Sequence, residues 1–325
     1  MKNSLLSDQF IPPWWAKNRH LQTLWGPLIR RLPPLPVMKR ERLELNDGDF
    51  IDLEIHRKPE SPTLLLLHGL EGSINSPYIR GMINVALKKG WQIVVMHFRS
   101  CSGEPNRLVQ SYHSGASHDL QTVVEMLQSK SIKIDYFVGY SLGGNVLLKW
   151  LAENEDGKIP VKAAAAVSVP LKLDVCATEI NKGFSKIYQA ALLRSLKAKT
   201  RNKLMQHDSE LLPNYETLKK LANFWQFDQA VTAPVHGFKN AQDYYDKVSS
   251  GQFIEHIKSP TLIIQSLDDP FMSPEVLPDL SKMPSNVILE KNSHGGHVGF
   301  VQGKYPWRPD YYLENRIPEY LAKFE

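Results

Sequence analysis

Short, continuous apolar runs that alternate with helical patterns are the feature that most constrains the fold of this chain. The runs read TLLLLHG, WQIVVMHFR, DYFVGY, AAAAVSV, SPTLIIQS and NVILEK, at residues 63–69, 91–99, 135–140, 163–169, 259–266 and 286–291. Runs of this length are typical of strands that are buried on both faces of a sheet. Helical patterns lie between them at residues 77–89, 118–128 and 142–155. Strands that alternate with helices predict an α/β fold, with a mostly parallel central sheet and helices on both of its faces.

Three segments do not follow this alternation of strands and helices. The stretch ERLELNDGDFIDLEIHR alternates apolar and polar residues around a turn at residues 46–49, which predicts a β-hairpin. Residues 10–37 are rich in Pro and Trp, so we expect the N-terminal segment 1–38 to wrap the body as irregular structure. Residues 171–245 are helical, basic and aromatic, which favours a helical cap insertion over two ordinary crossover helices with long loops. We therefore expect a single domain over residues 1–325 that carries both additions.

Residues 139–143 read Gly-Tyr-Ser-Leu-Gly, a G-x-S-x-G motif centred on Ser141. The five residues alone occur by chance in many proteins, and a structural serine at a helix start is the alternative interpretation. Here the motif follows a predicted strand and opens a predicted helix, as a nucleophile elbow requires. Gly139, Gly143 and Gly144 would let such a tight turn close against its neighbours. The motif therefore predicts Ser141 as the nucleophile of an enzyme with the α/β-hydrolase fold.

A serine hydroxyl is a weak nucleophile until a base removes its proton, so Ser141 needs a histidine. The base comes last in chain order in this fold. His97, His113 and His118 precede Ser141, which is the wrong order for the base. His207, His236 and His256 lie in or near the predicted insertion and do not follow a predicted strand. The Gly-rich stretch SHGGHVG instead follows the predicted strand at residues 286–291. We predict His297 as the base, with His294 as the alternative.

The third member of such a site is an acid at the end of the preceding strand. The strand SPTLIIQS leads into Leu-Asp-Asp-Pro at residues 267–270. The usual loop in this position reads Gly-x-x-Asp, and Ser266 aligned with that glycine makes Asp269 the acid. Asp268 is the alternative, one residue away. The order Ser141, Asp269, His297 agrees with the chain order of the fold.

An oxyanion hole would complete the site. His-Gly-Leu-Glu-Gly at residues 68–72 follows the first buried strand directly. In this fold that turn provides one backbone amide, and the residue after the nucleophile provides the second. We therefore predict the amides of Leu70 and Leu142 as the two donors.

Several longer stretches carry a resemblance to a known family. They are NRHLQTLW at residues 18–25, followed by HGLEG, HFRSCSGEPNR, SYHSG, GYSLGGN and HGGHVGF. Together they resemble the YheT-like branch of the α/β-hydrolases, which is related to the eukaryotic abhydrolase-domain lipases. One departure is at residues 97–100, which read His-Phe-Arg-Ser where the family usually has Asn-Phe-Arg-Gly. The resemblance implies carboxylester hydrolysis, with lipid-like esters favoured in the eukaryotic relatives.

Composition narrows the remaining functional classes. A net charge of +5 over 325 residues is mild, whereas a nucleic-acid-binding protein needs a concentrated basic stripe. Cys101 and Cys176 form no CxxC pair, so we expect reduced thiols in a cytoplasmic protein. No run approaches the ~18 apolar residues of a spanning helix, and the first twenty residues do not resemble a signal peptide. No His, Cys and carboxylate cluster has metal-site spacing, and we expect neither a metal nor a cofactor.

These predictions describe a serine carboxylester hydrolase that forms an acyl-enzyme on a small-molecule ester, with short- to medium-chain acyl or lipid-like groups. Acyl transfer to an alcohol or thiol is the alternative reaction, since both share the acyl-enzyme. A non-catalytic binding protein of the same fold is the third interpretation. In one interpretation the apolar residues of the insertion pack on the sheet and its basic residues only solvate the surface. In the other, some of the apolar residues line an acyl pocket and the basic residues give weak contact with anionic lipid. The apolar and aromatic residues concerned are Phe184, Ile187, Tyr188, Leu192, Leu193, Phe224, Trp225 and Phe227.

Overall fold

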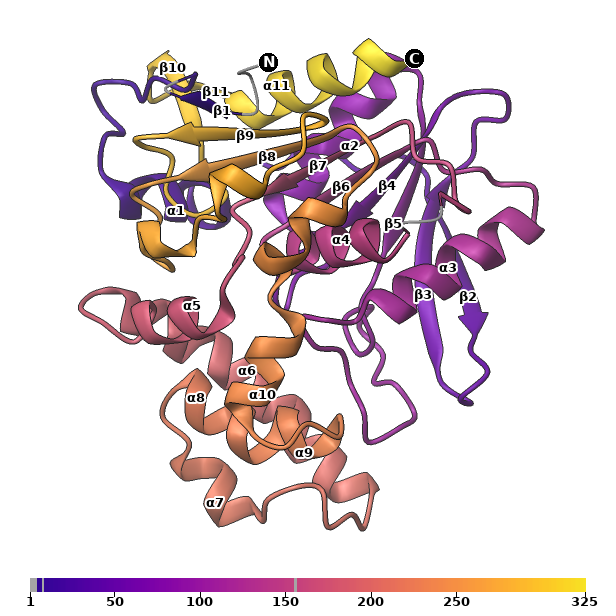
Figure 1. Cartoon of the computed structure of the whole chain (residues 1–325), viewed down its shortest axis with the longest axis vertical. Coiled ribbons are helices and arrows are strands. Elements are labelled where there is room, and N and C mark those ends of the chain that lie inside the picture. Colours follow the sequence, from indigo (N-terminus) through magenta and orange to yellow (C-terminus); the bar gives the residue numbers. More distant parts are fainter. Residues whose placement is uncertain (1–4, 8, 155–156) are drawn as a thin grey trace.

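A nine-stranded sheet forms the centre of the computed structural model, which describes residues 5–7, 9–154 and 157–325 (Figure 1). The strand order is β1-β9-β8-β7-β6-β4-β5-β3-β2, and all neighbours from β1 to β5 are parallel. Strands β3 and β2 add an antiparallel hairpin at the far edge. The strands are β1 (Leu5–Ser7), β2 (Lys39–Glu44), β3 (Phe50–His56), β4 (Thr63–Leu67), β5 (Gln92–Met96), β6 (Tyr136–Tyr140), β7 (Ala163–Val167), β8 (Thr261–Ser266) and β9 (Val287–Asn292).

Helices cover both faces of the sheet because each central strand is apolar on both sides. Leu64 and Leu66 of β4 pack with α2 (Pro77–Lys89) and α11 (Tyr312–Leu321). Leu65 and Leu67 pack on the opposite face with α3 (Ser117–Ser129) and α4 (Leu142–Glu153). Adjacent side chains of a strand point to opposite faces, so a continuous apolar run supplies both cores. The predicted α/β fold and its mostly parallel sheet are confirmed.

The predicted strands and the hairpin at residues 39–56 are present, but three further strands were not predicted. Strand β1 is three residues long, too short to stand out as a pattern. Strands β10 (Val301–Tyr305) and β11 (Arg308–Tyr311) form a separate antiparallel pair. Prolines at 306 and 309 interrupt that stretch, and proline within a run argues against a strand. A two-stranded ribbon tolerates them because its outer edges need no ladder hydrogen bonds.

The expectation of irregular structure throughout residues 1–38 was wrong, because helix α1 occupies Arg19–Leu28. The side chain of Asn18 caps the helix by accepting from the amides of His20 and Leu21, at 2.8 and 3.2 Å. Gln22 is fully buried, and its amide group donates to the carbonyl oxygens of Ala16 and Val301. The helix is therefore held by a local cap and by contacts to a segment nearly 280 residues away.

Six α-helices lie between β7 and β8, with a π-helix (Asp228–Thr232) between α8 and α9 and a 3-10 helix (Ser250–His256) after α10; we call α5–α10 the inserted helices. They are α5 (Leu173–Glu179), α6 (Ser185–Gln206), α7 (Tyr215–Lys220), α8 (Phe224–Phe227), α9 (Ala233–Val235) and α10 (Ala241–Val248). Figure 1 shows them as a group below the sheet layers. They pack around two apolar clusters of their own, one of which includes Leu193, Leu218 and Phe227.

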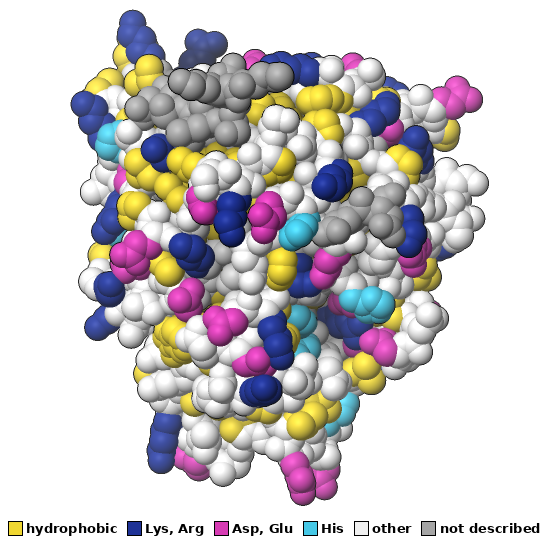
Figure 2. Space-filling view, in the orientation of Figure 1, with side chains coloured by type: hydrophobic (Ala, Val, Ile, Leu, Met, Phe, Trp, Pro, Cys, Tyr) yellow, Lys and Arg dark blue, Asp and Glu magenta, His cyan; other side chains and the backbone are white. Residues whose placement is uncertain are grey.

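The surface carries charges of both signs. Acidic and basic side chains are interspersed across the middle of the face shown in Figure 2, and hydrophobic side chains form small patches between them. Among the described residues, no helix combines the length and apolar character needed to cross a bilayer.

Candidate functional site

Ser141 lies on a tight turn between β6 and α4, with φ 51° and ψ −122°. Non-glycine residues seldom adopt a positive φ, and such strain is common at functional sites. Two glycines make the turn possible. A Cβ at position 139 would lie 2.5 Å from the carbonyl oxygen of Gly143, and one at position 143 would lie 2.4 Å from that of His68. The G-x-S-x-G spacing is therefore a steric requirement of this turn.

The imidazole of His297 lies between Ser141 and Asp269. Its Nε2 is 2.9 Å from Oγ of Ser141, and its Nδ1 is 2.8 Å from Oδ2 of Asp269. The Asp269 side chain is fully buried and that of His297 is largely so. Phe271 stacks on the imidazole, with 4.0 Å between ring centroids, and its amide donates to Oδ1 of Asp269. Stacking and hydrogen bonds thus hold the ring in one orientation.

The two alternatives from the sequence, Asp268 and His294, pair with each other. Nδ1 of His294 lies 3.2 Å from Oδ2 of Asp268, and the imidazole is exposed. Asp268 also accepts from the amide of Gly296 at 2.9 Å and from the hydroxyl of Ser266. In the described part of the chain, neither side chain has a hydrogen bond to Ser141 or His297. Asp268 therefore shapes the loop that carries His297.

Leu70 and Leu142, the predicted oxyanion donors, lie at the ends of β4 and β6 and line the same cavity as Ser141. The amides on either side of Leu70 are engaged: Gly69 donates to the Tyr78 hydroxyl at 3.0 Å, and Glu71 donates to the Tyr112 hydroxyl at 2.8 Å. Leu142 begins helix α4, where a backbone amide has no partner within the helix. Within the described ranges neither leucine amide donates to another protein group, which leaves both able to bind an oxygen.

Glu71 connects this loop to the inserted helices, a contact that the sequence did not predict. Its backbone has φ 57°, and its side chain is nearly buried. The carboxylate accepts from the hydroxyl of Tyr112 and the ammonium of Lys199, both at 2.8 Å, and from the hydroxyl of Ser195. Since Lys199 and Ser195 belong to α6, the conformation next to Leu70 depends on the inserted helices.

His68 holds the start of the same loop. Its Nδ1 donates to the carbonyl oxygen of Gly69 at 2.7 Å, and its Nε2 accepts from the amide of Phe98 at 3.2 Å. Burial lowers the pKa of His68 to about 3, so the ring stays neutral at physiological pH. A neutral imidazole can donate from one nitrogen and accept at the other, as this position requires.

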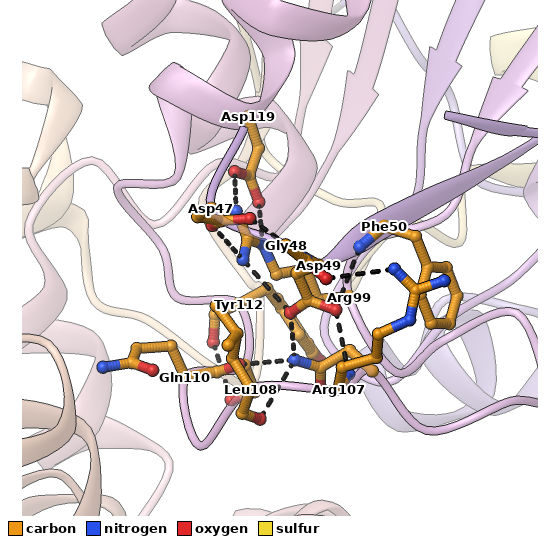
Figure 3. Close-up of polar contacts among 12 residues, drawn as sticks. Asp47, Gly48, Asp49, Phe50, Arg99, Arg107, Leu108, Gln110, Tyr112 and Asp119 are labelled. Carbon is orange, nitrogen blue, oxygen red and sulfur yellow. Dashed lines mark hydrogen bonds and ion pairs between the residues drawn. The ribbon is translucent and has the colours of Figure 1, made fainter. Parts of the chain in front are cut away.

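A buried cluster around Arg99 supports the loop that ends at Tyr112 (Figure 3). The guanidinium contacts the carboxylates of Asp47, Asp49 and Asp119 at 2.7, 3.2 and 2.7 Å. Asp49 also accepts from the side-chain amide of Asn106 and the backbone amide of Arg107. The cluster therefore joins the β2–β3 turn and α3 to the chain segment that precedes Tyr112.

Ser100 shows how the chain accommodates its departure from the family pattern. Its φ is 64°, a conformation in which the usual glycine carries no strain. The Ser100 hydroxyl donates to the side-chain oxygen Oδ1 of Asn106 at 2.5 Å and accepts from the backbone amide of Asn106 at 3.0 Å. These two bonds offset the cost of the serine backbone conformation.

Arg99→Met should lower the free energy of unfolding by about 3–5 kcal/mol, because it leaves buried carboxylates without their cation. Arg107→Met is the matched control, since Arg107 pairs with Glu44 at the exposed surface and should cost ~1 kcal/mol or less. Denaturant unfolding of both variants measures the difference. Equal losses of unfolding free energy in the two variants would show that the Arg99 cluster stabilises the fold no more than an exposed ion pair does.

Two cavities meet at Ser141. The inner cavity, of about 160 Å³, extends beneath the inserted helices. The outer cavity, of about 410 Å³, extends past His297 between α1, α2 and α6. Both are lined by Leu70, Glu71, Ser141, Leu192 and Phe271. The apolar wall of the inner cavity includes Leu173, Ala177, Ile180, Phe224, Phe227 and Val231.

Two further histidines line the inner cavity. The rings of His113 and His236 are 4.5 Å apart on the wall of the inner cavity. Burial lowers the pKa of both, that of His236 to about 4. Across the described ranges, no three His, Cys, Asp or Glu side chains are arranged to hold a metal ion.

Comparisons with known proteins identify the family of this chain. Residues 62–304 match the model of the alpha/beta hydrolase fold family. The chain is 43% identical to the candidate esterase YheT of Escherichia coli (strain K12), covering 98% of this chain and 94% of that protein. It is 28% identical to the human phospholipase ABHD3, covering 98% and 79%, and 29% identical to a monoacylglycerol lipase of Saccharomyces cerevisiae, covering 78% and 58%.

A solved structure has the same fold. The esterase Pf2001 of Pyrococcus furiosus superposes with a TM-score of 0.56 at 16% identity, covering 91% of this chain and 98% of that one. At this identity the likeness concerns the fold alone. The sequence relatives are named as esterases and lipases, and the predicted family is confirmed. The chain therefore belongs to the α/β-hydrolase fold family, in its YheT-like branch, and is a hydrolase of the esterase and lipase type.

Proposed function

We propose that the protein is a serine carboxylester hydrolase in which Ser141 is the nucleophile, His297 the general base and Asp269 the orienting acid. The single observation that carries this proposal is the position of His297, whose two ring nitrogens lie 2.9 Å from Ser141 Oγ and 2.8 Å from Asp269 Oδ2. A carboxylate can only accept, so it selects the tautomer with the proton on Nδ1. Nε2 is then free to accept the serine proton.

The reaction follows as acyl transfer in two steps. Ser141 Oγ attacks the ester carbonyl carbon while His297 takes its proton, and the oxyanion binds the amides of Leu70 and Leu142. His297 then protonates the leaving alcohol, and the carbonyl re-forms as the acyl-enzyme. Water, deprotonated by the same histidine, attacks the acyl group and releases the acid.

The two cavities would receive the two halves of the ester. The leaving oxygen must take its proton from Nε2 of His297, and His297 lines the outer cavity. We therefore assign the outer cavity to the alcohol and the inner cavity to the acyl chain, with the inserted helices as its cap. The apolar wall of the inner cavity suits a hydrocarbon chain. The relatives named as phospholipase and monoacylglycerol lipase support lipid-like esters.

Labelling with a fluorophosphonate tests the proposal directly. The reagent should modify Ser141 and block ester hydrolysis in the same proportion, because it reacts with a serine activated by a neighbouring base. Peptide mapping by mass spectrometry identifies the labelled residue. Full hydrolytic activity in a protein fully labelled at Ser141 would contradict the proposal.

The rate constant kcat/KM should rise about fourfold per methylene from acetyl to butyryl or hexanoyl esters and fall for long chains. Each buried methylene contributes roughly 0.8 kcal/mol until the cavity is full. Nitrophenyl esters from two to about sixteen carbons measure the profile. Ala177→Leu, within the inner cavity, should move the optimum to shorter chains, whereas Ala190→Leu on the exposed side of α6 should not. A flat profile would contradict an acyl site in this cavity.

A further inference from the structure

The outer cavity, which contains Ser141 and His297, opens to solvent where α1 and α6 border it. Pro27 of α1 and Ala191 of α6 both line the cavity and are both exposed. The ring of His20 on α1 lies 4.5 Å from that of Phe184 at the start of α6, so the two helices approach each other here. Helices α1 and α6 therefore border an exposed side of the outer cavity, through which an ester could reach Ser141.

Exposed apolar side chains continue outward from the cavity on α6. Tyr188 and Ala191 line the cavity, and Phe184 and Ile187 lie four residues before them. Residues four apart share one face of a helix. Phe184 is 49% exposed and Ile187 is 58% exposed, so this face stays apolar after it leaves the cavity.

Helix α1, which also borders the outer cavity, likewise has exposed apolar residues next to a residue that lines it. Leu24 lines the cavity, and Leu28 lies four residues further on, with 72% of its surface exposed. Ile29 is 51% exposed beside it. We call Leu28, Ile29, Phe184 and Ile187 the apolar rim. Exposed apolar side chains commonly mark an interaction surface when they form one patch, and these four extend the apolar lining of a single cavity on the two helices that border it.

The charge of the surrounding helices indicates what the apolar rim contacts. Helix α6 contains six Lys and Arg residues and no Asp or Glu; Lys199 is paired with Glu71 and Lys203 is buried, so four of the six remain for contacts at the surface. Residues 9–38, which include α1, contain four Lys and Arg residues and again no Asp or Glu. Among the basic residues, Arg19, Arg31, Lys186 and Arg194 are exposed. Apolar side chains flanked by cations are typical of elements that lie in the headgroup region of an anionic membrane.

We propose that the apolar rim docks on an anionic lipid surface, with Leu28, Ile29, Phe184 and Ile187 inserted and the flanking cations at the headgroups. This orientation would place the opening of the outer cavity against the lipid, so that an ester could pass from the surface to Ser141. The inference deepens the proposed function and rests on it for the identity of the cavity, but the docking itself can be measured without catalysis.

Co-sedimentation with vesicles tests the docking. The protein carries Ser141→Ala, so no lipid is consumed, and the vesicles contain phosphatidylcholine with or without about one quarter phosphatidylglycerol. The protein should bind the anionic vesicles at least tenfold more tightly than the neutral ones. Raising the salt from about 50 mM to about 500 mM should weaken that binding, because the Debye length falls below ~5 Å.

The double variant Leu28→Ser, Ile187→Ser, which we call the rim variant, should bind the anionic vesicles at least tenfold more weakly than the parent protein. Met205→Ser is the matched control, because Met205 is a 71% exposed apolar residue of α6 that lies about 27 Å further along the same helix. With Ser141 present, both variants should hydrolyse a water-soluble short-chain ester at the parent rate, which shows that they are folded.

Three results would overturn the proposal. The first is unchanged vesicle binding by the rim variant, and the second is an equal loss in the Met205→Ser control. The third is a dimer in lipid-free solution that only the rim variant dissociates, since a second copy would then cover the rim. Vesicle docking without any ester hydrolysis would instead leave the rim intact and contradict the proposed function.

Discussion

Ser141→Ala is expected to lower kcat for ester hydrolysis by about 10⁶-fold, because no other group would supply the attacking oxygen. The fold should survive the change. The backbone of Ser141 is held by its amide, which donates to Val167, and by its carbonyl, which accepts from Asn145. Neither bond involves the side chain, so we expect the free energy of unfolding to change by ~1 kcal/mol or less.

Single-turnover and steady-state kinetics with a nitrophenyl ester measure the rate loss, and denaturant unfolding checks the fold. The matched control is Ser168→Ala. Ser168 is another serine at a strand end with a positive φ, and its hydroxyl accepts from the amide of Val298. Within the described ranges no hydrogen bond joins the Ser168 and Ser141 hydroxyls, so removing the Ser168 hydroxyl should lower kcat far less. Hydrolysis near the parent rate in pure Ser141→Ala protein would refute Ser141 as the nucleophile.

Asp269→Asn should lower kcat by about 10⁴-fold with little change in the overall fold. The asparagine amide is nearly isosteric with the carboxylate but can donate to Nδ1 of His297. The ring would then carry its proton on Nε2, where it could no longer accept from Ser141. The loss should appear in kcat more than in KM, because the change affects the proton transfer and leaves the cavities intact.

Asp268→Asn is the control for that variant. Asp268 is adjacent in sequence and also faces a histidine, but its partners are His294 and the Gly296 amide. We expect a loss of about tenfold or less, from a looser loop around His297. The pair His297→Ala and His294→Ala should differ in the same way. A larger loss from Asp268→Asn than from Asp269→Asn would mean that the acid is one residue earlier.

Much of the fold could be predicted because its signals are local. The run TLLLLHG needs burial on both faces, and only a covered parallel sheet offers that to several such runs in one chain. Gly139 is required by sterics within the five-residue turn, and Gly143 by the close approach of the His68 carbonyl oxygen. Both glycines belong to the motif, so the elbow around Ser141 was visible in the sequence. The prolines, in contrast, concealed α1, whose stability comes from the Asn18 cap and from the burial of Gln22.

The sequence by itself determined the α/β fold, the family and three residues in a specific order, Ser141, Asp269 and His297. Their catalytic roles stay predictions, but their 2.8–2.9 Å contacts exist only in the folded chain. The sequence favoured Asp269 but left Asp268 as the alternative. Only the tertiary structure shows that Asp269 faces His297, since the Phe271 amide binds Asp269 whereas the Gly296 amide binds Asp268.

Tertiary structure also decided the link between Glu71 and Lys199 and the meeting of two cavities at Ser141. Glu71 and Lys199 are 128 residues apart, and α1 and α6 border one cavity from distant parts of the chain. A local sequence pattern reflects the backbone conformation that neighbouring residues favour. A cavity or a long-range ion pair depends on how complete elements pack, so it has no counterpart in the spacing of residues along the sequence.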